Sequence, residues 1–189
     1  MAQRMNVMDI ILIGILFGGL LVGFSQGMVR AAIMIAAFYL SVVLASLYFP
    51  LMGLWVQGTF GSPPLVAQYL GFIIVVVIAF AALTFAGVYT LRYVEIGGRF
   101  ALLDKLIGAF LGLTLATLIG GFLAMLLWNL MVIRDGRSLN LPLFQWLGGQ
   151  VFSSVLIGLF ANNILPVAYE FARPLLPASA QILLDPITR

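Results

Sequence analysis

Four long apolar runs dominate this chain, and short polar segments separate them. The runs cover residues 7–24, 31–49, 65–91 and 106–131. No charged side chain lies between Arg30 and Arg92. A helix of about 20 apolar residues matches a hydrocarbon core about 30 Å thick, so each run predicts a transmembrane helix. The pattern therefore predicts an all-α polytopic membrane protein with four transmembrane helices.

The boundaries between these helices follow from prolines, glycines and charges. Pro50 is expected to end the second helix, because proline cannot donate the next backbone hydrogen bond. The connection from there to Pro64 carries no charge. We divide the chain into a four-helix transmembrane domain, residues 1–137, and a C-terminal tail, residues 138–189.

Within the tail, residues 143–165 have a different pattern from the four runs. Their apolar side chains recur at helical spacing at Phe144, Leu147, Val151, Val155 and Leu159. The opposite face carries Gln145, Gly149, Ser153 and Ser154. This pattern favours an amphipathic helix that lies in the membrane interface. A fifth crossing is the alternative, because the segment is just long enough to span.

Composition limits the chemistry available to the chain. It is 63% hydrophobic and 8% charged, which excludes the ordinary globular and disordered classes. It has no cysteine and no histidine, so disulfides, most zinc sites and histidine catalysis are excluded. No phosphate-binding loop, dinucleotide fingerprint or nucleophile elbow is present. We therefore expect no enzyme activity, no catalytic or metal-binding residues and no cofactor.

The net charge of +3 comes from residues scattered at segment ends, which is a topology signal and does not indicate nucleic-acid binding. With the N-terminus outside, the cytoplasmic segments hold Arg30, Arg92, Arg99 and Lys105. The residues that oppose this orientation are Arg4, Arg134 and Arg137. The positive-inside rule then favours, by a small margin, an orientation with both termini extracytoplasmic.

Small residues recur at every fourth position in the last apolar run. They are Gly108, Gly112, Ala116, Gly120 and Ala124. The first run has a similar series that includes Gly19, Gly23 and Gly27. Helices in a bilayer associate through close backbone approach, so such stripes predict helix-packing faces, inside the chain or toward a partner. Background composition is the alternative explanation, since small residues are common in membrane helices.

Two acids, Asp9 and Asp104, each stand just before an apolar run. A carboxylate at that position can accept free backbone N–H groups of the first helical turn. We predict that both are caps. An ion or proton site is the alternative, because acids at membrane depth are often functional. With both termini outside, the two acids lie on opposite sides of the membrane and cannot form a pair.

Two motifs resemble the hallmarks of the colicin V production protein (CvpA) family. The first comprises Asp9-Ile10-Ile11 and the later stretch GFSQGMVR at residues 23–30, which ends in Arg30. The second is LDKLIGAFLGL at residues 103–113, which contains Asp104 and Lys105. The resemblance covers about residues 5–131. The family often has basic residues where Ser25-Gln26 and Thr114-Leu115 stand here, which puts a charged cytoplasmic surface in doubt.

The resemblance implies a prokaryotic inner-membrane protein linked to colicin export and envelope homeostasis. We expect a non-enzymatic protein that acts by helix packing, as a scaffold or accessory subunit. The alternatives are a small transporter or channel, and an accessory subunit of a larger membrane complex. The expected partners are membrane lipids and other integral membrane proteins or further copies of the chain, with no nucleic acid.

Overall fold

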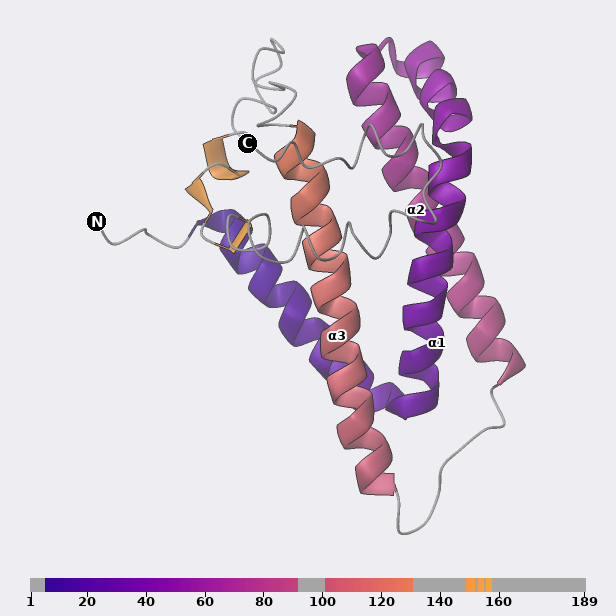
Figure 1. The fold of residues 1–189 in the computed structure, drawn as a ribbon, viewed down its shortest axis with the longest axis vertical. Coiled ribbons are helices and arrows are strands. Elements are labelled where there is room, and N and C mark those ends of the chain that lie inside the picture. Colours follow the sequence, from indigo (N-terminus) through magenta and orange to yellow (C-terminus); the bar gives the residue numbers. More distant parts are fainter. Residues whose placement is uncertain (1–5, 92–100, 131–148, 152, 155, 158–189) are drawn as a thin grey trace. The chain divides into compact units, whose positions relative to one another are not determined.

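The structure, a computed structural model, describes residues 6–91, 101–130, 149–151, 153, 154, 156 and 157. It contains three long helices, α1 (Val7–Phe60), α2 (Pro64–Thr90) and α3 (Ala101–Trp128), shown in Figure 1. Each is long and apolar enough to cross a membrane. The regular structure of the described residues is entirely helical, which confirms the all-α prediction for this part of the chain.

Helix α1 contains the first two predicted transmembrane helices. It runs through 54 residues, but Gly27 has non-helical backbone angles, with φ 80° and ψ 176°. A positive φ is accessible to glycine because it has no Cβ. We call residues 7–26 the first arm of α1 and residues 28–60 its second arm. The break between them lies where the sequence predicted a loop, but it occupies a single residue.

The prediction that Pro50 ends the second helix is wrong. Helix α1 continues through Pro50 and ends at Phe60, before Gly61, whose φ is 62°. Proline in a helix interior costs roughly 3 kcal/mol, because it removes one hydrogen bond and crowds the preceding turn. Here the residues beyond the proline pack against α2, and Val56 is almost fully buried. Tertiary packing therefore outweighs the local preference of the proline.

The described residues fall into two compact units, which divide within α1 and within α3. In the unit Phe17–Ala116, the second arm of α1 and α2 lie side by side as a hairpin (Figure 1). A Cβ placed on Gly71 of α2 would lie 2.6 Å from the backbone nitrogen of Gly53, so the two backbones touch. The aromatic pair Phe49–Phe72 adds to this interface, with ring centroids 5.9 Å apart.

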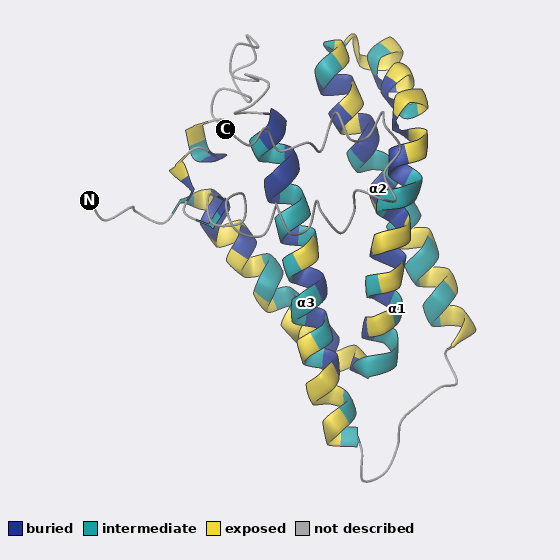
Figure 2. Ribbon diagram, viewed as in Figure 1, coloured by how far each residue is buried: buried dark blue, intermediate teal, exposed yellow. Residues whose placement is uncertain are grey.

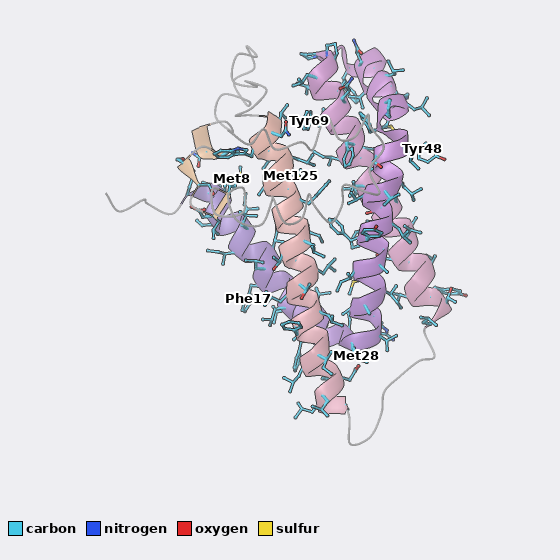
Figure 3. The ribbon with its side chains drawn as sticks, in the orientation of Figure 1. Met8, Phe17, Met28, Tyr48, Tyr69 and Met125 are labelled. Carbon is cyan, nitrogen blue, oxygen red and sulfur yellow. The ribbon has the colours of Figure 1, made fainter. Side chains whose placement is uncertain are left out.

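Each long helix has many exposed residues, shown in yellow in Figure 2, and large apolar side chains are among them. In Figure 3, Tyr48 points away from the second arm, whereas Tyr69 of α2 is almost completely buried. Phe17 on the first arm and Phe85 on α2 are also largely exposed. Apolar residues that would be unfavourable against water are suited to a lipid environment. This surface identifies the chain as a helical membrane protein.

The other unit comprises Met1–Leu16 and Thr117–Arg189, of which the structure describes only part. The start of α1 and the end of α3 contribute two buried methionines, Met8 and Met125, labelled in Figure 3. Most of the predicted segment 143–165 lies outside the described residues. Its described part is helical at residues 149–151 but not at Ser154, so the helix is interrupted where a continuous one was predicted.

Candidate functional site

The first candidate site is a backbone contact between the first arm of α1 and α3. A Cβ placed on Gly112 would lie 2.7 Å from the Cα of Gly23 and 2.9 Å from its nitrogen. A Cβ on Gly108 would lie 2.8 Å from the Cα of Gly27. Real Cβ atoms essentially never come closer than 3.0 Å to such atoms, so no other residue fits here unless the helices move apart.

The same contact continues toward Ala116. A Cβ on Gly19 would lie 2.6 Å from the carbonyl oxygen of Gly112 and also against the Cβ of Ala116. The predicted series Gly19, Gly23, Gly27 therefore packs against the predicted series Gly108, Gly112, Ala116. Close approach of this kind supplies van der Waals contact between helices in a bilayer, where no hydrophobic driving force acts between them.

The remaining members of the α3 stripe, Gly120 and Ala124, are buried but packed differently. A Cβ on Gly120 would lie 3.4 Å from a terminal methyl carbon of Leu12, which is ordinary van der Waals contact. Of the α1 glycines outside the series, Gly14 and Gly18 have no described atom within 4 Å of an added Cβ. Glycine is therefore sterically required at Gly112 and not at Gly120 or Gly14.

The second candidate site lies at the break in α1. The carboxylate of Asp104, in the first turn of α3, accepts a hydrogen bond of 2.9 Å from the backbone N–H of Met28. Met28 is the first residue of the second arm and has no helical turn before it, because Gly27 leaves the helical conformation. A helix start needs such acceptors for its unpaired N–H groups. Asp104 thus caps the second arm of α1 from another helix.

The predicted role of Asp104 was to cap its own helix, and the contact with Met28 adds a partner on another helix. This contact has a physical reason. The Asp104 carboxylate lies against Gly27, where an added Cβ would be 3.0 Å from its Cγ atom. The contact is possible because Gly27 has no side chain and takes a positive φ. Gly27 and Asp104 therefore act together to form the turn between the two arms.

Of the two basic residues of the motifs, Arg30 follows the break by three positions, and Lys105 is next to Asp104, which contacts the break. The Lys105 ammonium lies 5.9 Å from the ring centroid of Phe24, within the range of a cation–π contact. Lys105 is exposed and Arg30 is half-buried. Both side chains therefore remain at least partly accessible.

The third candidate site surrounds Asp9 at the start of α1. Asp9 is only 2% exposed. Its Oδ2 atom accepts the backbone N–H of Asn6 at 2.9 Å, a contact from the first helical turn back to the preceding residue that is typical of a helix start. Its Oδ1 atom accepts the Ser154 hydroxyl at 2.7 Å and the Leu156 backbone N–H at 3.0 Å. Asp9 therefore binds the beginning of its own helix and also a segment far along the chain.

Sequence reasoning found both acids but missed their long-range partners. Ser154 was assigned to the wet face of the tail, yet it is buried against Asp9. Asn6 was not singled out, although its side-chain nitrogen donates to the backbone oxygen of Gln150 and to Ser153. Asparagine three residues before Asp9 was a usable signal of a helix start. Nothing in the local pattern indicated which distant segment would dock there.

The described residues contain no group of three or more acidic, histidine or cysteine side chains placed to hold a metal ion. The arrangement consists instead of a glycine packing face and two carboxylates that bind backbone N–H groups. Together with three long apolar helices, these features define a multi-pass helical membrane protein.

Comparison with known proteins agrees with this class. The family described as "Colicin V production protein" matches residues 8–165, which is most of the chain. The chain therefore belongs to the colicin V production protein family, as its motifs around Gly27 and Asp104 suggested. No curated protein and no solved structure matches it.

Proposed function

We propose that this protein is a four-crossing membrane scaffold or accessory subunit that acts in the inner membrane of a prokaryote, in an envelope process such as export. The proposal rests on the observation that the helices have two kinds of surface, glycine faces that contact another helix and faces of exposed apolar side chains. Glycine faces fix α3 against α1 by backbone contact. The opposite faces carry large exposed apolar side chains on every described helix, among them Phe17, Phe85 and Phe110.

The four crossings are the first arm, the second arm, α2 and α3. The first arm of about 20 residues is about 30 Å long, which equals the hydrocarbon core. Gly27 then reverses the course of the chain, and Asp104 satisfies the backbone N–H that this reversal exposes. An unsatisfied N–H is costly near lipid, so such a cap is what a turn at the membrane surface needs. Four crossings place both termini on the same side of the membrane, and the positive-inside rule favours the side outside the cytoplasm.

A scaffold role follows from what the two kinds of surface can do. The backbone contact at Gly23 and Gly112 leaves no room for a side chain, so it favours one fixed arrangement of the helices. The outer faces present aromatic and branched residues, such as Phe85 at 74% exposed, to the membrane plane. A fixed helical frame with an apolar exterior is suited to pack against lipids, other membrane helices or a second copy.

Photo-cross-linking in intact membranes tests this role. A photoreactive phenylalanine analogue replaces Phe17, Phe85 or Phe110 on the outer faces, and Phe72 serves as the control because it is fully buried. A scaffold predicts a protein adduct of constant mass from at least one exposed position and none from Phe72. If all three exposed positions give lipid adducts alone, the scaffold proposal fails.

A further inference from the structure

The contacts of Asp9 join the two distant ends of the described chain. Asn6 immediately precedes α1 and Asp9 lies in its first turn, whereas Gln150 follows the end of α3 by about 20 residues. The side chains of Asn6, Asp9 and Ser154 make hydrogen bonds within each of these segments and between them. Four of them connect positions more than 140 residues apart.

The interruption of the tail helix explains why a carboxylate is needed there. At Ser154 the backbone is not helical, and a helix that starts after such a break needs acceptors for its first N–H groups. The Ser154 hydroxyl oxygen accepts the N–H of Ile157 at 3.1 Å, as an N-cap serine does. Asp9 accepts the N–H of Leu156 and the proton of the Ser154 hydroxyl. The new helix start is thus completed by a side chain from α1.

We infer that Asp9 is the positioning residue that fastens the described residues between Gln150 and Ile157 to the membrane face at which α1 begins. Asn6 immediately precedes a helix that spans the bilayer in our proposal, so it marks that face. Gln150 and Ser153, which accept hydrogen bonds from its side chain, must lie at the same face. The burial of Asp9, Val151 and Ile157 shows that this docking is a packed contact and not a loose surface encounter.

This fastening is a property of the chain alone and does not depend on the scaffold role. Asp9 and Asp104 also have the same kind of structural role. Each acid belongs to the first turn of one helix, and each accepts the backbone N–H of a helical segment that starts elsewhere. Asp104 holds the second arm after the break at Gly27, and Asp9 holds the tail after the break at Ser154.

Cross-linking of a cysteine pair measures the docking directly. The chain has no cysteine of its own, so Val7→Cys with Gly149→Cys forms a unique pair. Both positions are exposed, and each is next to a residue of the Asn6–Gln150 hydrogen bond. A short bifunctional maleimide reagent should join the two cysteines within one chain in intact membranes. The pair is then combined with Asp9→Ala, Asp9→Asn or Ser154→Ala, and with Asp104→Asn as the matched control.

We expect Asp9→Ala to lower the ratio of docked to undocked tail by at least about tenfold, because it removes both hydrogen bonds from the tail to the Asp9 carboxylate and one charge-assisted hydrogen bond alone accounts for about that factor. Asp9→Asn keeps one acceptor oxygen and should fall between Asp9→Ala and the parent. Ser154→Ala should also reduce the yield, and Asp104→Asn should leave it unchanged. Should Asp9→Ala fail to accumulate in the membrane, the Asp9→Asn and Ser154→Ala variants decide the question. Absence of the cross-link in the parent pair, or equal yields in the parent, Asp9→Asn and Ser154→Ala, overturns the inference.

Discussion

Replacing Gly112 with alanine adds one methyl group at the closest approach of α1 and α3. The added carbon would lie 2.7 Å from the Cα of Gly23, whereas carbon atoms in good contact are about 3.5–4.0 Å apart. The helices must therefore separate by about 1 Å, and overpacking of this kind costs roughly 1–3 kcal/mol. The atoms that must yield belong to backbone, so a change of rotamer cannot relieve the clash.

The matched control is Gly14→Ala in the first arm of α1, where no described atom lies within 4 Å of the new carbon. Alanine is better than glycine in a helix by about 1 kcal/mol, so Gly14→Ala should be neutral or stabilising. The same helix preference applies to Gly112→Ala. The difference in unfolding free energy between the two variants therefore isolates the interhelical contact, and it should be roughly 1–3 kcal/mol.

The assay is reversible unfolding in mixed micelles of mild detergent and increasing sodium dodecyl sulfate, followed by circular dichroism. Gly112→Ala should unfold at a lower fraction of the denaturing detergent than the parent, and Gly112→Leu lower still. The reasoning is refuted if Gly112→Ala and Gly14→Ala have the same unfolding midpoint.

Further variants test the other contacts by the same measurement. Gly27→Ala should lower the free energy of unfolding by more than Gly61→Ala. Both glycines have a positive φ, but only Gly27 lies against Asp104. Equal effects of the two variants would contradict the contact between Gly27 and Asp104. Asp104→Asn keeps an acceptor oxygen for Met28 and should leave the free energy of unfolding nearly unchanged. Asp104→Leu should lower it by about 1–2 kcal/mol. A severe defect in the asparagine variant would show that the negative charge itself matters. Gly120→Ala should cost less than about 0.5 kcal/mol, since the added carbon makes ordinary contact with Leu12.

The helices were predictable from sequence because their length and lack of charge are set by the bilayer. The small-residue stripes were visible for a similar reason, since close packing needs small side chains at a fixed spacing. The sequence also marked Gly27, as a member of the small-residue series and of the GFSQGMVR motif. That the break is confined to one residue depends on its positive φ and on the Asp104 carboxylate 77 positions later.

Two features were not predictable because they depend on contacts distant in sequence. Pro50 is a local helix breaker, and only the packing of residues 51–60 on α2 explains why α1 continues through it. Ser154 has the appearance of a solvent-facing serine in an amphipathic pattern, and its burial results from Asp9 at the other end of the chain. Local periodicity carries no information about such pairings.

The central claim is that Gly27 divides α1 into two crossings, which makes four in total. Single cysteines at Ser25 and Ser62, which flank the second arm on its two sides, test it most directly in intact cells with a membrane-impermeant maleimide. The account predicts that Ser62→Cys labels from outside and that Ser25→Cys labels only after the membrane is opened. Labelling of both cysteines from the same side would show that the second arm does not cross the membrane and would contradict the four-crossing arrangement.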